Sequence, residues 1–590
     1  MMMACAKNWL ALYLSIIAFP ICLGYLQPTA ITQRFPYSSR YELSHFNNRL
    51  TFPTSSSLTY SSIYEYTRSY SSSDLHATPD TRENISTESS ISSNTEKPTG
   101  QQILSLAIPA LAGLAIDPLM TLADTAFVGR DASNADALAG VGSAAALLTF
   151  SFYLFNFLCT ATTPLVSQRR ASGDEDGAIS VGGQALSLAV ILGVCLTIVL
   201  LTFSQPLLQV MGTENTGIDA NTYATSFLQI RSLAAPAVFL TSASIGILRG
   251  YLDTQTTFII LAGANIINFC LDIILIPGLG MGPTGAALAT TTAEWISALS
   301  FLGVLGGILP STKESDLGKV IRNYTDSDFA NNESEYTESP HNQIRIFPTV
   351  DVPRWADFKP LLVASSSAFI RSLVLQMSIA GAAAMAARAT VSGATVDGAS
   401  ASVAAHQIAL QMWLLCSFVC DALAAASQAL VADAVGRENQ LAIRNVSKTV
   451  ILYSLALGVF LSVGLEIGDL TNFLLDFFTK DAATQNALKP LLSIIILAQP
   501  LNSFVFAADG ILQGASQFSY QAKAMVISVV VGISSFVTMD YILYDEYGMN
   551  TLIHVWYALV VLQMMRGLTS MVKLIEKDGP FNLIGTKSFT

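Results

Sequence analysis

Carboxylate and carboxamide side chains interrupt two long apolar stretches in the first half of the sequence. Asp117 and Asp124 are seven residues apart, so a helix places them on roughly the same face. Asn268 and Asp272 are four residues apart, which puts them on adjacent turns of one helix face. Oxygen ligands in this arrangement suit a sodium ion or an exchangeable proton. Because a charge at the centre of a membrane span costs about 2.5–3.5 kcal/mol, we expect these residues to serve a function.

Each carboxylate also has a structural interpretation. Asp117 precedes Pro118 and can mark a kinked turn at the membrane interface. Asp124 lies near the end of its apolar run, so it can simply occupy a helix end. Asp272 is flanked on both sides by apolar residues, and a solvated surface position is hard to sustain there. The sequence therefore favours a functional role most strongly for Asp272.

The second half of the chain offers further polar candidates. Asp421 lies in an apolar run, where it either faces a central cleft or packs between helices. Arg388 and Gln407 are additional candidates for contact with a substrate or ion, whereas Arg371, Asp509, Asp540 and Gln411 are weaker ones. The two histidines inside apolar runs, His406 and His554, have no second histidine at metal spacing, and none of the seven cysteines forms a C-x-x-C pair. We expect neither a metal site nor catalytic residues.

The composition indicates that these residues are positioned by elements buried in a membrane. Of the 590 residues, 52% are hydrophobic and 12% are charged, whereas soluble proteins carry roughly 25% charged residues. The mean hydropathy is +0.50. A net charge of −12 argues against a nucleic-acid partner. We therefore predict an all-α polytopic membrane protein whose surroundings are the lipid bilayer.

Twelve apolar stretches each reach the roughly 20 residues needed to cross a bilayer. They lie near 103–128, 137–166, 178–204, 223–248, 255–276, 283–309, 359–386, 402–434, 444–468, 487–509, 522–543 and 550–575. The long polar loop at 310–357 separates six spans from six, which predicts an N-lobe at 101–309, a C-lobe at 358–576 and a tail at 577–590. Basic residues concentrate in the loops after spans two, four, eight and ten, so these loops should face the cytoplasm or stroma.

An internal repeat supports the division into two lobes. The segment LAAPAVFLTSASIGILRG at 233–250 shares L-A-x-P and G-I-L-x-G with LAQPLNSFVFAADGILQG at 497–514, at a constant offset of 264. Because six spans separate the copies, the halves are parallel repeats about an axis along the membrane normal, with a cleft between them. The same offset takes Asp124 to Arg388, and takes Asn268 and Asp272 to glycine and phenylalanine. The candidate cation site therefore belongs to the first half alone.

The N-terminal residues resemble targeting sequences. Residues 1–26 contain Lys7 followed by an apolar run, as in a signal peptide or a signal anchor. Residues 27–100 are rich in Ser and Thr, with spaced arginines, as in a transit peptide or a disordered tail. Together they are similar to the bipartite presequences of plastids acquired by secondary endosymbiosis. We expect a multi-pass protein of the plastid envelope, with the plasma membrane or an endomembrane as the alternative.

Several of these segments together resemble one transporter family. They are IPALAGLAIDPLMTLADTAFVGR at 108–130, NFCLD at 268–272, AAHQIALQMWLLCSFVCDALAAASQALVADAVGREN at 404–439, GILRGYLDTQT at 246–256 and GILQGASQ at 510–517. The combination is similar to multidrug and toxic compound extrusion (MATE) transporters, in the branch like DNA-damage-inducible protein F, over about residues 101–575. The long N-terminal extension and the 310–357 loop depart from typical bacterial members.

The resemblance implies a two-lobe, 12-helix antiporter that exports small organic compounds by alternating access, driven by H+ or Na+ and without another cofactor. It implies that Pro109 corresponds to the family's first-helix proline and that Asp124, Asn268 and Asp272 form the coupling site. Asp421 matches an acidic position of this branch. Pro109 and Pro118 interrupt one helix, so we expect it to bend there.

Two other functions share this architecture: a flippase for lipid-linked precursors and an exporter of organic acids, for which Arg371 or Arg388 would be suited. A passive channel or a receptor-like membrane scaffold is a third class. The protein is expected to act as a monomer on a small organic substrate.

Overall fold

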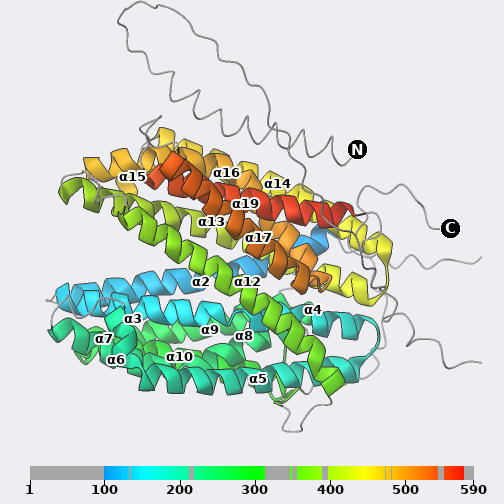
Figure 1. The fold of residues 1–590 in the computed structure, drawn as a ribbon. Coiled ribbons are helices and arrows are strands. Elements are labelled where there is room, and N and C mark those ends of the chain that lie inside the picture. The colour runs from blue at the N-terminus through cyan, green and yellow to red at the C-terminus, as the bar shows by residue number, and fades with distance from the viewer. Residues whose placement is uncertain are drawn as a thin grey trace, which may run out of the picture. The chain divides into compact units, whose positions relative to one another are not determined.

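The computed structural model describes residues 99–131, 135–210, 218–311, 346–348, 355–388, 396–471, 473–479, 481–542 and 551–576. The regular secondary structure in these ranges is helical (Figure 1). The expectations for residues 1–98, for most of the 310–357 loop and for the 577–590 tail lie outside the described residues. Of that loop, Ile346 is fully buried in the hydrophobic core of the N-lobe, and its N–H donates to the carbonyl of Leu305 at 2.8 Å.

The helices follow the predicted spans in order. In the first half they are α2 (Thr99–Asp131), α3 (Ala135–Leu154), α4 (Phe157–Ala171), α5 (Glu175–Thr202), α6 (Ser204–Val210), α7 (Ile218–Ser232), α8 (Ala235–Gly250), α9 (Thr254–Ile273), the π-helix η2 (Ile274–Gly278) and α10 (Gly282–Leu305). In the second half they are α12 (Trp355–Arg388), α13 (Val396–Gly436), α14 (Gln440–Leu470), α15 (Phe473–Phe478), α16 (Ala482–Gly514), α17 (Phe518–Val537), the π-helix η3 (Thr538–Ile542) and α19 (Thr551–Ile575).

Eleven helical segments of the described chain are long and apolar enough to cross a bilayer, or 12 if one bent pair counts as a single span. That pair is α7 with α8, which meet at 47°, and Pro236 lies in the first turn of α8. Proline has no backbone N–H to donate, so it fits the first turn of a helix, where that donor would have no partner in the helix. The predicted all-α fold with 12 spans is confirmed.

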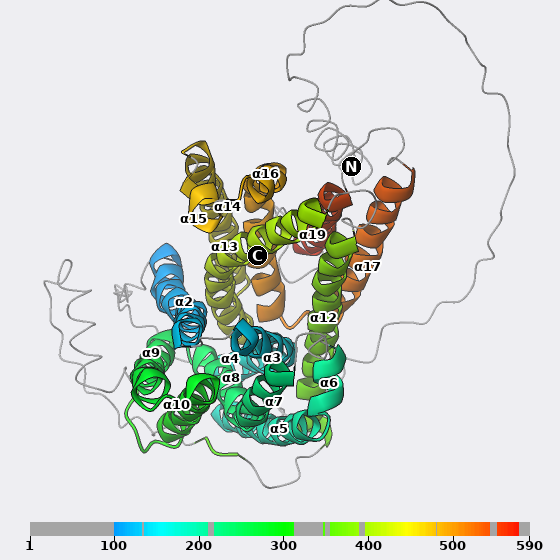
Figure 2. The ribbon, with the colours of Figure 1, turned by 90° about the vertical axis from the view of Figure 1, so that its left-hand side faces the viewer.

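Two long helices link the two lobes. The first half of the chain, α2–α10, forms the N-lobe and the second half, α12–α19, forms the C-lobe, with α2 and α12 on opposite sides of the boundary between them (Figure 2). Ile103 and Leu106, near the start of α2, are buried in the C-lobe core. Leu361 and Ala364, near the start of α12, are buried in the N-lobe core. Each of these two helices therefore couples one lobe to the other.

Close helix packing explains the glycines of the internal repeat. A Cβ atom at Gly250 would lie 2.9 Å from Val166 of α4, and one at Gly514 would lie 2.9 Å from Val431 of α13. Gly246 and Gly510, one turn earlier, face the same two helices. The G-x-x-x-G spacing thus lets α8 approach α4 and lets α16 approach α13, as is common between helices in membranes. The repeat encodes the same helix pair in each lobe.

The four loops with many basic residues share one turn geometry. The helix before each loop ends at a residue with positive φ: Gly173, Leu252, Glu438 and Ser516. At each of them two backbone N–H groups reach back to the last helical carbonyls, the Schellman arrangement. In three of the loops an Asp or Asn then caps the next helix by accepting a backbone N–H. These turns keep consecutive helices antiparallel.

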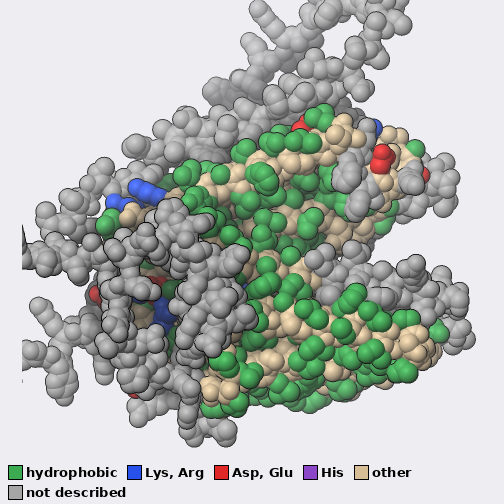
Figure 3. Space-filling model, turned by 180° about the vertical axis from the view of Figure 1, so that it is seen from behind, with side chains coloured by type: hydrophobic (Ala, Val, Ile, Leu, Met, Phe, Trp, Pro, Cys, Tyr) green, Lys and Arg blue, Asp and Glu red, His purple; other side chains and the backbone are tan. Residues whose placement is uncertain are grey.

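The lobes touch at the end with the basic loops and separate at the other. Figure 3 shows an open wedge between the lobes at one end of the molecule. At the opposite end Arg170 and Asp433 form an ion pair of 2.6 Å, and Gln168 donates to the carbonyl of Gly514 at 2.8 Å. The described structure is therefore closed on the side predicted to face the cytoplasm or stroma.

Candidate functional site

The N-lobe candidates Asn268 and Asp272 lie together deep in the protein. Asn268 is 2% exposed and Asp272 is fully buried, one turn apart on α9. The Oδ1 atom of Asn268 has no hydrogen-bond partner among the described residues. A buried acceptor without a donor is costly unless an ion, a proton carrier or water completes it. Their chemistry suits a small cation.

The backbone next to this pair is irregular. Asp272 lies two residues before η2, which contains Pro277. Single-turn π-helices are frequent at functional sites, because they change the direction of neighbouring side chains. An equivalent π-helix, η3, occurs 264 residues later in the C-lobe. The π-helix is therefore part of the repeat, whereas Asp272, two residues before it, is specific to the N-lobe.

Helix α2, which packs against α9, carries the other N-lobe candidates. Its backbone is helical through Asp117, Pro118 and Asp124, but their side chains lie outside the described residues. Pro109 is half-buried in the described part of the same helix. The roles of these four residues stay predictions.

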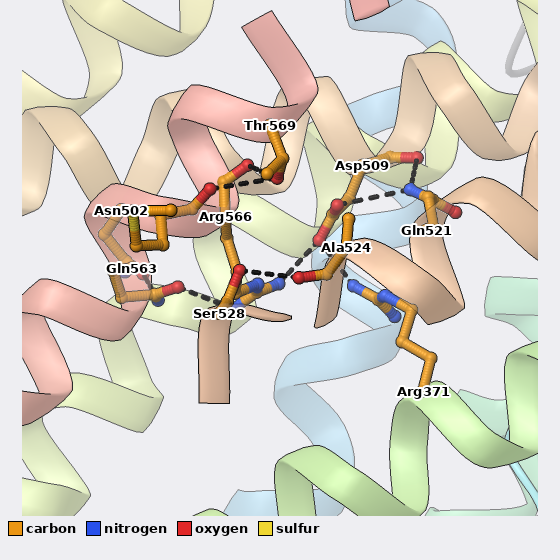
Figure 4. A network of polar contacts seen from close by, with 10 residues as sticks. Arg371, Asn502, Asp509, Gln521, Ala524, Ser528, Gln563, Arg566 and Thr569 are labelled. Atoms are coloured by element: carbon orange, nitrogen blue, oxygen red, sulfur yellow. Dashed lines mark hydrogen bonds and ion pairs between the residues drawn. The ribbon is translucent and has the colours of Figure 1, made fainter. Parts of the chain in front are cut away.

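A second polar cluster joins four helices of the C-lobe (Figure 4). Asp509 of α16 accepts hydrogen bonds from Arg371 of α12 and, at 2.5 Å, from Arg566 of α19. Gln521 of α17 donates to the backbone carbonyl of Asp509 at 3.1 Å and to its carboxylate at 3.2 Å. Buried charges are stable only when they are paired and hydrogen-bonded, as they are here. These residues tie the C-lobe together around one carboxylate.

A chain of hydrogen bonds extends this cluster into the lobe. Arg566 donates to Gln563 at 2.6 Å, Gln563 donates to Asn502 at 2.9 Å, and Asn502 donates to Ser417 of α13 at 3.2 Å. All four residues are less than 9% exposed. Because these hydrogen bonds follow one another from residue to residue, the network holds the Arg566 side chain in a defined position.

The C-lobe cluster continues to the boundary between the lobes. Asp421 is half-buried on α13 and interacts electrostatically with Arg371 and with Arg249 of the N-lobe helix α8. Tyr153 of α3, which is 44% exposed, interacts electrostatically with Asp421, Arg371 and Arg566. Asp421 therefore lies among charged groups of both lobes, which fits a position at the cleft.

The remaining candidates are apart from these clusters. Gln407 is exposed on α13, 14 residues from Asp421, which is about 21 Å along a helix. The side chain of Arg388 lies outside the described residues. The structure thus brings Asn268 together with Asp272, and Asp421 together with Arg371 and Asp509.

Sequence reasoning missed Arg566 and the amides around it. The signal was present, because Arg566 is an arginine within the apolar stretch 550–575, where a charge is costly. The amides carried no comparable signal, since buried Gln and Asn are identified only by their partners. Among the described residues, no group of three or more His, Cys, Asp or Glu side chains is placed to hold a metal ion.

A two-lobe bundle of membrane-spanning helices, with buried polar clusters and a wedge open at one end, is typical of a membrane transporter. The MatE family model matches residues 109–274 and 389–537. The chain therefore belongs to the MatE family of membrane transporters.

Known proteins agree with this assignment. The chain is 27% identical to Protein DETOXIFICATION 45, chloroplastic, of Arabidopsis thaliana, over 82% of this chain and 79% of the relative. It is 32% identical to DNA damage-inducible protein F of Escherichia coli, over 35% of this chain and 44% of the relative. An outward-facing structure of a multidrug resistance MATE family transporter shares the fold, with a TM-score of 0.64, 19% identity and coverage of 81% of this chain and 95% of that one.

Proposed function

We propose that this transporter exports small organic compounds in exchange for H+ or Na+. The observation that carries the proposal is the burial of Asp272 beside Asn268, whose Oδ1 atom has no protein partner among the described residues. We assign these two residues, with Asp124 of the adjacent α2, to the ion site. The ion neutralises Asp272 when it binds, and it binds more tightly to one conformation than to the other. That difference in affinity couples ion binding to the conformational change.

Alternating access then requires the lobes to part at their closed end. The wedge in Figure 3 gives access from one side, while the contacts of Arg170 and Gln168 close the other. Binding of the ion from the open side and of the substrate from the opposite side would favour different conformations. The gradient of the ion thereby supplies free energy for export.

Ion flux in proteoliposomes tests the proposal. The full chain is reconstituted, a pH or sodium gradient is imposed, and efflux of organic probes is followed for the native protein and for Asp272→Asn. We expect Asp272→Asn to abolish gradient-driven transport and to leave membrane insertion intact. Glu466→Gln, which removes an exposed acid on α14, is the matched control and should transport normally.

Normal coupled transport by Asp272→Asn would remove the ion site from α9. Flux in both proteins without any gradient dependence would indicate a channel. Translocation of a lipid-linked precursor with no ion movement would indicate a flippase instead.

We further propose that the protein resides in the plastid envelope. The support is the presequence-like N-terminal composition and the word chloroplastic in the name of the Arabidopsis relative. A fluorescent protein fused after the first ~100 residues tests this. Signal at the cell surface or in secretory membranes alone would contradict it.

A further inference from the structure

The break between α7 and α8 is supported by one face of α5. Pro236 has no N–H, so it leaves the carbonyl of Ser232, four residues earlier, without its usual helical donor. The hydroxyl of Thr197 on α5 donates to that carbonyl at 2.8 Å. A Cβ atom at Gly193, one turn earlier on α5, would lie 2.8 Å from the Pro236 nitrogen. Helix α5 therefore packs directly on the proline and satisfies the carbonyl that it frees.

The C-lobe repeats this arrangement in a helix that does not break. Pro500 of α16 is the counterpart of Pro236 at the offset of 264. The hydroxyl of Ser462 on α14 donates at 2.6 Å to the carbonyl of Ile496, four residues before Pro500. A Cβ atom at Gly458 would lie 3.0 Å from the Pro500 nitrogen. Because α16 continues as one helix across Pro500, this arrangement is compatible with both a bent and an unbroken span.

The N-lobe adds an ion pair beside its break. Arg231, in the last turn of α7, donates to both carboxylate oxygens of Glu294 on α10, at 2.5 and 2.9 Å. The two side chains are 11% and 24% exposed and lie within membrane-spanning segments. The Nε1 atom of Trp295, the next residue of α10, donates to the carbonyl of Leu233 in the break at 3.2 Å. Two parallel charge-assisted bonds fix orientation, so α10 holds the end of α7 in place.

The C-lobe has no equivalent of this ion pair. The offset of 264 takes Arg231 to Ile495. Helix α19, the last span of the C-lobe as α10 is of the N-lobe, contains no acidic residue. The span with the ion pair is bent by 47°, whereas the span without it is unbroken. Two forms of one proline-containing span therefore occur in the same protein, and the ion pair distinguishes them.

The ion pair also lies between the candidate ion site and the boundary of the lobes. Helix α10 packs against α7 and against α9 and η2, which adjoin Asp272. The guanidinium group of Arg231 lies 6.0 Å from the ring centroid of Phe152 on α3. The next residue of α3 is Tyr153, which interacts electrostatically with Asp421 of the other lobe. The end of α7 therefore contacts both the helix beside the ion site and a helix at the boundary.

We propose that Arg231 and Glu294 are positioning residues for transport. Their ion pair holds α7 and α8 bent, and its release lets this span straighten as α16 does. Straightening by 47° would move the start of α7 by up to roughly 13 Å, since α7 extends about three turns from the break. This movement shifts α7 along α3 and changes the N-lobe side of the boundary. The role rests on the proposed alternating access, because it supplies one of its steps.

Distances between spin labels test the hinge in the full chain. The labels are placed at Thr222→Cys on α7 and Asp176→Cys on α5, both exposed, in a background without other cysteines. The test variant combines Arg231→Ile with Glu294→Leu, so it has apolar residues as in the C-lobe and leaves no buried charge unpaired. We expect a second distance population, displaced by up to roughly 13 Å, with the melting temperature retained. If this variant does not melt as a single species, Glu294→Gln is measured instead.

Two further variants separate the ion pair from a general effect of substitution. The exchanged pair, Arg231→Glu with Glu294→Arg, should restore the native distances. Thr292→Val removes a 2.7 Å hydrogen bond within α10, to the carbonyl of Leu288, and should leave the distances unchanged. Native distances in the apolar variant, or the same displacement in Thr292→Val, would overturn the proposal.

Exchange in proteoliposomes gives a second readout. The apolar variant should lower the maximal rate tenfold or more and leave the apparent affinity for the driving ion unchanged within twofold, because the pair acts on the conformational step. Lowered affinity with a native maximal rate would contradict the proposed role. The label distances do not depend on transport. Normal coupled transport by Asp272→Asn would therefore refute the ion site, whereas unchanged distances in the apolar variant would refute the hinge.

Discussion

Replacing Gln428 by leucine should open the closed end of the transporter. Gln428 of α13 is 3% exposed, and its Nε2 atom donates to the carbonyl of Thr160 of α4 at 2.7 Å. That carbonyl lies four residues before Pro164, which has no N–H to donate to it. A residue of one lobe thus satisfies a carbonyl that proline frees in the other.

The magnitude follows from the loss of this partly buried hydrogen bond. Such a bond contributes about 0.5–1.5 kcal/mol net. The cost falls on the closed state alone, since parting of the lobes exposes the carbonyl to water. A shift of that size changes the ratio of the two conformations by roughly 2–13-fold, since 1.4 kcal/mol is a factor of about ten. The variant should therefore populate a form that is open on the side of the basic loops.

Distances between spin labels measure the shift. Labels at Asp176→Cys and Gln440→Cys, in a background without other cysteines, report on exposed first turns of α5 and α14 in different lobes. We expect a longer distance to appear in Gln428→Leu. The control is Gln499→Leu, because Gln499 is fully buried but donates within its own helix, to Ile495 at 3.2 Å. An unchanged distance distribution, or the same shift in the control, would refute the reasoning.

Three further predictions concern stability. Gly510→Ala should cost about 1–3 kcal/mol, because its Cβ would collide with α13, whereas Gly464→Ala has no atom within 4 Å and should be near neutral in detergent melting. Glu438→Gly should raise the melting temperature, since φ is +54° there and a left-handed residue other than glycine costs roughly 1–2 kcal/mol; no gain would contradict this. The pKa of Asp481 is lowered because the hydroxyl and N–H of Thr484 donate to its carboxylate. Asp481 should thus stabilise the fold above its ordinary pKa and lose this effect as pH falls through the lowered value, so Asp481→Ala should flatten a melting curve measured against pH in the acid range.

Predictions from sequence succeeded where a single helix carries the information. The spans were legible because about 20 apolar residues are needed to cross the hydrocarbon layer, whatever their neighbours. Asn268 and Asp272 could be paired because a spacing of four fixes one helix face. The sequence predicted α7 and α8 as one span, because both helices are apolar. The bend between their axes arises only in the packed structure.

The charged cluster of the C-lobe shows where such reasoning stops. Arg371 and Asp509 were weak candidates and Arg566 was not considered, although all three interrupt apolar stretches. Their importance comes from meeting at one carboxylate, and Arg566 and Asp509 are 57 residues apart in the chain. Periodicity shows which residues share one side of a helix, but it does not show which other helix packs against that side.

The sequence by itself determined the all-helical membrane fold, the two parallel halves and the position of the buried carboxylate on α9. These depend on hydropathy, repetition and spacing within one helix. The tertiary structure decided which charged residues of the C-lobe meet and which end is closed. It paired Gln428 with a carbonyl 268 residues away, because side chains find partners through the packing of helices that are distant in sequence.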